Sequence, residues 1–235
     1  MIRVIPFESL GHQNHGWLDA RHHFSFAGYF DPRRMGQPPL RVWNDDTIKA
    51  GTGFPMHPHR DMEIITYIRK GAISHEDDLG NKGRTVEGNV QVMSAGSGIM
   101  HSEYNLEEVD TTLFQIWIET AEPGIKPRWE TKPFPQQPVT ELQLLVSGRD
   151  EHRTRNVLRI YQDAALWVAK SVSGTTLKHE FGHDRHAYLV VSAGAVIING
   201  IKAGLRDGVS ITNEQSLEIV LQTDGEVVLV DLPQM

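Results

Sequence analysis

The sequence predicts an all-β protein built from two β-barrels, and three observations lead to this prediction. Short runs rich in Ile, Val, Tyr, Phe and Trp recur, and Gly, Pro, Asn or Asp separates them at intervals of roughly 8–12 residues. The apolar spacing of an amphipathic helix is scarce. A chain of 235 residues with 39% hydrophobic residues can also supply two cores, each of about 100 residues.

Each predicted strand is one of these runs, and a proline-dense segment divides them into two groups. Residues 123–138 (PGIKPRWETKPFPQQP) cannot lie in the interior of a sheet, because proline removes a backbone donor. We therefore expect a first barrel over residues 1–122, a connector over 123–138 and a second barrel over 139–235. The predicted strands lie within 40–48, 62–71, 83–88, 89–96 and 112–120, then within 158–170, 188–194, 195–200, 209–212, 217–222 and 226–233.

The two halves resemble each other loosely. Placing Gly71 over Gly194 puts His57 on Glu180 and His59 on Gly182, so only the first half has the polar pattern described below. We expect two related barrels, and we expect the histidines of the second half to be structural or exposed.

The composition excludes several classes of protein. A net charge of −7 and the absence of any Lys/Arg-rich run argue against nucleic-acid contact. No apolar run approaches the roughly 18 residues needed to span a bilayer, and the first residues lack a signal-peptide core. We expect a cytoplasmic monomer. With no cysteine in the chain, a metal must be held by nitrogen and oxygen ligands.

Two histidines in the stretch GTGFPMHPHRDME carry the first functional signal. His57 and His59 are two residues apart, so on a strand both imidazoles point to one face. Imidazole is the commonest protein ligand for iron, copper, nickel and zinc. The alternative is a pair of exposed or hydrogen-bonded histidines in a loop.

A second pair favours the metal. In MSAGSGIMHSEYN, His101 and Glu103 again share a strand face, directly after a glycine turn. Three histidines and one carboxylate leave open positions on a six-coordinate ion, and zinc is the competing occupant because the same set fills a tetrahedron. Glu63 is a second carboxylate candidate, since strand parity would turn it inward with His57 and His59.

These motifs resemble those of the pirin family of bicupins, and closely those of its bacterial quercetin 2,3-dioxygenases. The first cupin motif is present in Gly51, His57, His59 and Glu63, although its closing glycine comes one residue late, and Gly96 stands where the second motif usually has proline. The blocks that carry the resemblance are HHFSFAGYFDPRRMG, LRVWNDD, HPHRDMEIITY, MSAGSGIMHSEYN and, near the end of the chain, VLVDLP.

The resemblance implies two cupin barrels of the double-stranded β-helix (jelly-roll) type, with one divalent metal in the first. The implied ligands are His57, His59, His101 and Glu103, and Fe(II) is the expected ion, with Zn, Ni, Co, Mn or Cu as alternatives. The implied reaction opens a flavonol such as quercetin with O2 and releases CO, with Glu103 as the base. A non-enzymatic, redox-sensing regulator that binds a protein partner is the alternative.

Other acidic pairs predict turns. Asp45 and Asp46 precede Thr47 and indicate a turn between two strands, and Asp77 with Asp78 indicates the tip of a hairpin.

Overall fold

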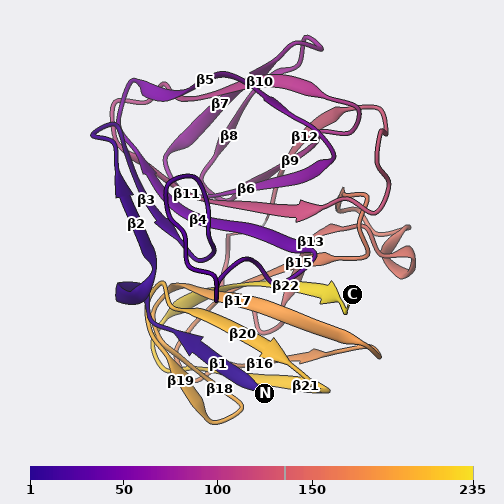
Figure 1. The fold of residues 1–235 in the computed structure, drawn as a ribbon. Coiled ribbons are helices and arrows are strands. Elements are labelled where there is room, and N and C mark those ends of the chain that lie inside the picture. Colours follow the sequence, from indigo (N-terminus) through magenta and orange to yellow (C-terminus); the bar gives the residue numbers. More distant parts are fainter. Residues whose placement is uncertain (135, 235) are drawn as a thin grey trace. The chain divides into compact units, whose positions relative to one another are not determined.

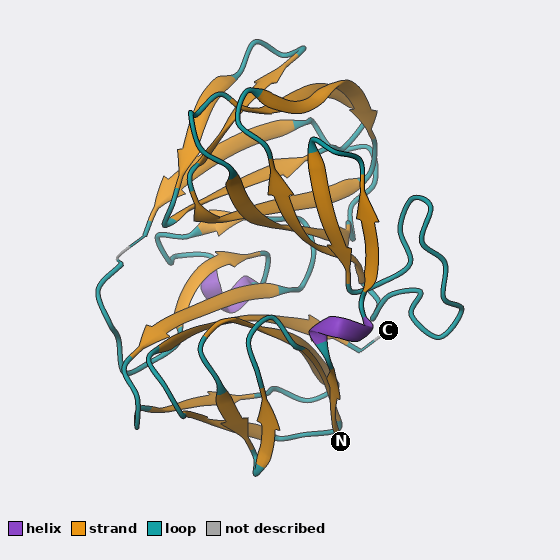
Figure 2. Cartoon of the chain, turned by 90° about the vertical axis from the view of Figure 1, so that its left-hand side faces the viewer, coloured by secondary structure: helices purple, strands orange, loops and turns teal. Residues whose placement is uncertain are grey.

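The computed structural model describes residues 1–134 and 136–234. Strands dominate it, and its only helices within those ranges are two short 3-10 turns, drawn in purple in Figure 2. These turns are η1 (Phe7–Ser9) and η2 (Asp150–His152). No helix among the described residues has the length and apolar character needed to cross a membrane. The all-β prediction is confirmed.

Two compact units make up the chain, and each contains two facing sheets (Figure 1). The first barrel comprises residues 11–134 and 158–162. Its larger sheet has the order β12-β9-β6-β11-β4-β3-β2 and its smaller sheet the order β5-β10-β7-β8. Its strands are β2 (Gly11–Asn14), β3 (Leu18–His22), β4 (Leu40–Ile48), β5 (Thr52–His59), β6 (Met62–Lys70), β7 (Ala72–Asp77), β8 (Lys82–Val86), β9 (Asn89–Ser94), β10 (Ile99–Asn105), β11 (Thr111–Glu119) and β12 (Arg128–Pro133), and the two-residue β14 (Leu158–Arg159) falls within the same unit.

The second barrel comprises residues 1–10, 136–157 and 163–234. Its smaller sheet has the order β16-β21-β18-β19, and its larger sheet contains the order β1-β20-β17-β22-β15-β13. Its strands are β1 (Ile2–Ile5), β13 (Gln143–Ser147), β15 (Ala165–Ser171), β16 (Thr176–Glu180), β17 (Arg185–Ala193), β18 (Val196–Ile198), β19 (Ile201–Ala203), β20 (Gly208–Thr212), β21 (Ser216–Leu221) and β22 (Gly225–Pro233).

The strand orders of the two barrels correspond. Adding eleven to each number in β5-β10-β7-β8 gives β16-β21-β18-β19, and β9-β6-β11-β4 becomes β20-β17-β22-β15 in the same way. Every strand is antiparallel to its described neighbours. The loose sequence repeat therefore corresponds to a repeat of topology.

The first barrel differs from the predicted residues 1–122 at both of its ends. β1 pairs with β20, so residues 1–10 belong to the second barrel. The proline-dense stretch contains β12, which pairs with β9 at the edge of the first larger sheet. An edge strand tolerates proline because one side of its backbone makes no ladder hydrogen bonds.

Interdigitating apolar side chains fill the space between the sheets. In the first barrel, Ile64 of β6 and Met93 of β9 pack against Ile99 of β10, so the two sheets share one core. In the second barrel, Leu189 of β17 packs with Leu177 and Ile219 of the smaller sheet. Burial of these side chains is the main source of stability.

Candidate metal centre

β5 brings His57 and His59 to the interior of the first barrel. Exposure alternates at the end of this strand, where Met56 and Pro58 are exposed and the two histidines are half-buried. β5 forms one edge of its sheet, which explains how a strand can contain Pro55 and Pro58.

β10 lies beside β5 and supplies the other two predicted residues. His101 and Glu103 are both buried on this strand, whereas Met100, next to His101, is exposed. His101 is the register partner of His57, and a bulge follows before Glu103 pairs with Phe54. Gly98 enters β10 with a φ of 132°, a conformation that a side chain would strain.

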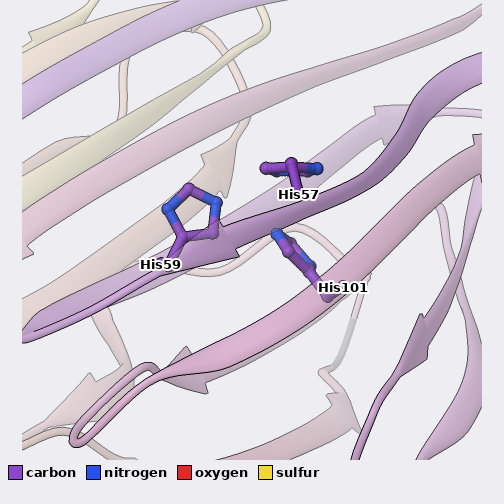
Figure 3. A group of neighbouring side chains, drawn as sticks. All are labelled: His57, His59 and His101. Carbon is purple, nitrogen blue, oxygen red and sulfur yellow. The ribbon is translucent and has the colours of Figure 1, made fainter.

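The three histidines form one compact cluster (Figure 3). Ring centroids are 4.8 Å apart for His57 and His59, 4.4 Å for His57 and His101, and 4.9 Å for His59 and His101. One candidate ligand atom from each of the three lies within 4.8 Å of the others. Trp117 packs edge-on against His59 and supports the cluster at a centroid distance of 4.9 Å.

The hydrogen bonds of these rings leave nitrogen lone pairs for an ion. Nδ1 of His57 lies 2.7 Å from the carbonyl oxygen of Pro55, which can only accept, so Nδ1 carries the proton. Nε2 of the neutral ring then has a lone pair available for a metal ion. Nε2 of His101 is buried and has no hydrogen-bond partner among the described residues. A buried, unpartnered nitrogen is costly unless something binds it.

Electrostatics favour neutral imidazoles in the cluster. Burial, together with repulsion from His57 and His75, lowers the pKa of His101 to about 3. Burial and the charges of His101 and His57 lower the pKa of His59 to about 4, although Glu103 opposes this shift. Metal binding requires unprotonated imidazole, so both rings are ready to bind near neutral pH.

Two glutamine side chains hold Glu103 in place. Gln91 donates through Nε2 to one carboxylate oxygen, and Gln115 donates to the other at 2.6 Å. Since both contacts come from N–H donors, the geometry is that of an ionised carboxylate with lone pairs remaining on each oxygen. Glu103 groups with His75 and His101 in a second potential metal-binding set that shares His101 with the first.

The donor set fits a divalent metal ion. Three imidazole nitrogens with an adjacent carboxylate suit iron, nickel, cobalt, copper or zinc, and no sulfur ligand is present to select a softer ion. Both potential metal-binding groups found among the described residues lie in the first barrel.

Comparison with known proteins places the chain in a family. A family model described as "Pirin" matches residues 4–118, and one described as "Quercetinase C-terminal cupin domain" matches residues 144–232. A pirin-like protein of Caulobacter vibrioides is 52% identical over 232 residues, which span 98% of this chain and 99% of that protein. The chain belongs to the pirin family. The resemblance of the motifs is confirmed, and the fold is that of a bicupin.

Further relatives of this pirin bear a functional name or a metal. A protein of Escherichia coli named quercetin 2,3-dioxygenase is 45% identical over 234 residues, 99% of each chain. The crystal structure of an Escherichia coli bacterial pirin, YhhW, in complex with nickel(II) matches with a TM-score of 0.93, 44% identity and complete coverage of both chains.

Glu63 does not join the cluster, so the parity argument for it was wrong. The chain reverses at Asp61, with a φ of 47°, and the strand alternation of β5 does not continue into β6. Ile64 packs into the core between the sheets, and Glu63 therefore points to the other face of β6. There it is fully buried and accepts a 2.7 Å hydrogen bond from Ser94.

The predicted turn at Asp45 and Asp46 is also wrong, because both lie buried within β4. Arg69 forms an ion pair with Asp45. Asp46 lines a cavity of about 270 Å³ together with aromatic residues that include Trp17, Phe26 and Phe54. Burial, reinforced by the nearby charges of Asp45 and Glu103, raises the pKa of Asp46 well above its usual value, which favours the protonated, neutral form of this side chain.

The hairpin tip was predicted one residue too early. Asp77 is the last residue of β7 and is buried, and the turn begins at exposed Asp78. His75, two residues before Asp77, was missed as a functional residue, although the spacing of the two resembles that of His101 and Glu103.

A histidine in the second barrel serves a different network. His179 is buried on β16 and bonds to Asp231 at 3.0 Å, and Asp231 also pairs with Arg185 and Arg149. Oppositely charged partners surround this carboxylate, which is the pattern of a structural ion-pair cluster.

Proposed function

We propose that this pirin is a metal-dependent dioxygenase that opens the heterocycle of a flavonol such as quercetin with O2 and releases CO. The observation that carries the proposal is the convergence of His57, His59 and the unpartnered Nε2 of His101 in a barrel that also contains an aromatic cavity. Relatives named quercetin 2,3-dioxygenase over the whole length support the choice of reaction. The proposed ligands are the three histidines with Glu103, and the proposed ion is one Fe(II) per chain.

The cavity lies one aromatic residue, Phe54, away from His57, and it is suited to a flat aromatic molecule. Its volume of about 270 Å³ lies just below the roughly 300–1,000 Å³ usual for small-molecule sites. Aromatic side chains connect it to the histidines: the ring of Phe54 lies 6.2 Å from that of His57, and Phe26 packs on Trp117, which contacts His59. A flavonol in this cavity would place its polar heterocycle toward the centre.

Asp46 is the polar group best placed to orient such a ligand within the cavity. As a neutral acid it donates a hydrogen bond, which suits a ketone or phenolic oxygen. Its side-chain oxygen Oδ1 is completely buried and has no hydrogen-bond partner among the described residues. A ligand oxygen would satisfy the group.

Glu103 takes the proton of the flavonol 3-hydroxyl. Its carboxylate is held by Gln91 and Gln115, so the base is oriented before the substrate arrives. Removal of this proton makes the ring electron-rich and able to react with O2. Two carbon–carbon bonds of the heterocycle then break, both oxygen atoms of O2 enter the ring-opened ester, the carbon between the broken bonds leaves as CO, and the proton returns to the product carboxyl group.

A bound metal ion supplies Lewis acidity and a route for electron transfer between the deprotonated flavonol and O2. The chain contributes the position of the substrate, the base and the exclusion of water from a half-enclosed cavity.

Reconstitution tests the proposal. Metal-free protein is loaded under anaerobic conditions with Fe(II), Mn(II), Co(II), Ni(II) or Cu(II), then mixed with quercetin and O2 while O2 uptake and CO release are measured. We expect one CO per O2 consumed, and no turnover without metal. Tight binding of one metal with no turnover under any metal would contradict the enzyme and favour the metal-binding regulator.

A further inference from the structure

A buried chain of three side chains runs from the metal ligand His101 to a carboxylate outside the predicted site. Nδ1 of His101 lies 3.3 Å from Nδ1 of His75, and Nε2 of His75 lies 3.1 Å from Oδ2 of Asp77. All three residues are at most 5% exposed. β7 runs beside β10 in the same sheet, where Asp77 is the register partner of His101 and His75 that of Glu103.

The surroundings of Asp77 determine the direction of the first hydrogen bond. The backbone N–H groups of Leu79 and Asn81 donate to Oδ1 at 3.1 and 2.9 Å, and the side-chain amide of Asn81 donates to Oδ2 at 2.9 Å. A carboxylate that receives three N–H donors is an acceptor only. The contact with His75 therefore requires the proton to be on Nε2 of His75.

For a neutral His75, the second hydrogen bond then has only one direction. A neutral imidazole with its proton on Nε2 presents a lone pair at Nδ1, so His75 accepts at that atom. His101 must donate through Nδ1–H, which leaves its Nε2 unprotonated. Nε2 is the buried, unpartnered atom of the cluster with His57 and His59. Trp129 stacks on the His75 ring at 4.9 Å and 9° and keeps its plane fixed.

We propose that His75 and Asp77 are positioning residues of the metal centre, which hold His101 in the Nδ1–H tautomer so that Nε2 is ready to bind the ion. The inference rests on the proposed centre at His57, His59 and His101. Partners of this kind orient metal-bound histidines and raise their basicity. This relay of hydrogen bonds, from Asp77 through His75 to His101, differs from a direct carboxylate contact because an imidazole lies between the carboxylate and the ligand.

The substitution Asp77→Asn reverses the relay without removing it. The two backbone N–H groups cannot turn, so they keep the amide oxygen of the new side chain, and its NH2 group faces Nε2 of His75. The Asn81 amide can turn over to accept from the same group. His75 then carries its proton on Nδ1 and donates to His101, which moves the His101 proton to Nε2. In the Ser-His-Asp triad of serine proteases, replacing the orienting aspartate by asparagine likewise keeps the geometry and gives the wrong histidine tautomer.

Metal affinity provides the first measurement. We expect Ni(II) affinity, from competition with a chelator, to fall by roughly 10–100-fold in Asp77→Asn, with an unchanged circular dichroism spectrum. Asp78→Asn is the matched control. Asp78 is exposed, and its carboxylate accepts a hydrogen bond from the backbone N–H of Met100 at 3.1 Å. No hydrogen bond between Asp78 and His75 is found among the described residues, so wild-type affinity is expected. Wild-type affinity in Asp77→Asn, or an equal loss in the control, would overturn the proposal.

Ring nitrogen resonances of the metal-free protein provide a second measurement, which needs neither activity nor a stable variant. Proton–nitrogen correlation spectra should place the proton of His101 on Nδ1 and that of His75 on Nε2 in the wild type. A proton on Nε2 of His101 would refute the relay. If the wild type binds no metal while the tautomers are as expected, the proposed function fails and the relay stands.

Discussion

Glu63 is the residue whose substitution gives the most quantitative test of the structure. Burial raises its pKa from the ordinary value of 4.5 to about 7, and hydrogen bonding from Ser94 together with weaker effects of Tyr161, Arg128 and Thr120 only partly offsets that shift. The folded protein therefore keeps a proton on Glu63 that the unfolded chain loses between pH 4.5 and about 7. A group with a raised pKa contributes stability below its unfolded pKa, and that stability is lost as the pH rises through the folded pKa.

The expected magnitude follows from the size of the shift. The difference between about 7 and 4.5 is about 2.5 pKa units, and each unit corresponds to about 1.4 kcal/mol, so about 3 kcal/mol is lost by pH 8. In Glu63→Gln the amide is neutral at every pH, as the protonated acid is below pH 4.5. The variant should match the wild type within about 1 kcal/mol at pH 4.5 and exceed its stability by about 3 kcal/mol at pH 8.

Urea denaturation of the metal-free proteins between pH 4.5 and 8.5 measures this difference. The depressed pKa values of His59 and His101 make both proteins less stable as the pH falls below 6.5, and this effect cancels in the comparison. Glu119→Gln is the control, because Glu119 is exposed at the end of β11 and should leave the pH profile parallel to that of the wild type. Parallel profiles for Glu63→Gln would refute the buried neutral acid, and loss of metal binding in that variant would refute its separation from the histidine cluster.

Other substitutions test the site itself. His101→Ala should abolish metal retention and turnover while the thermal transition of the metal-free protein persists, as measured by elemental analysis, quercetin assay and calorimetry; a variant that still holds metal would exclude His101 as a ligand. Glu103→Gln should weaken metal binding and lower kcat by roughly 10²–10⁴-fold, because the proposed general base is lost, and a kcat equal to that of the wild type would contradict that role. Asp46→Asn keeps a neutral donor and should retain quercetin binding, whereas Asp46→Leu should raise the quercetin Kd by about 10-fold, the value of one hydrogen bond of about 1.4 kcal/mol; equal binding by the two variants would contradict the donor role. Elemental analysis should give one tightly held ion per chain in the wild type and in His179→Ala, and two ions in the wild type would show a second site.

The sequence predicted the histidine pairs because their geometry is local. Positions two apart on one strand share a face whatever the rest of the chain does, so His57 and His59 could be placed together before the fold was known. The same reasoning failed for Glu63, since the parity count crossed the reversal at Asp61 between β5 and β6. Alternation is informative within a strand and uninformative across a turn.

Buried carboxylates were missed for a different reason. Asp46 and Asp77 occur in contexts that favour turns, and their burial depends on partners that spacing along the chain does not reveal. Asp77 is kept in the interior by bonds to His75 and Asn81, and Asp46 by the cavity wall around it. The pairing of β1 with a strand some two hundred residues later was likewise beyond any local pattern.

That pairing has a consequence for how the protein can be made and divided. Residues Ile2–Ile5 are synthesised some two hundred residues before their partners in β20, near Gly208. The second barrel can therefore complete its larger sheet only after β20 has emerged from the ribosome, while the first, whose residues end at 162, can close much earlier. A fragment cut at the proline-dense stretch would leave β20 with a bare edge that can pair with other molecules and aggregate. Moving residues 1–10 to the end of such a fragment, through a flexible linker, should restore its solubility.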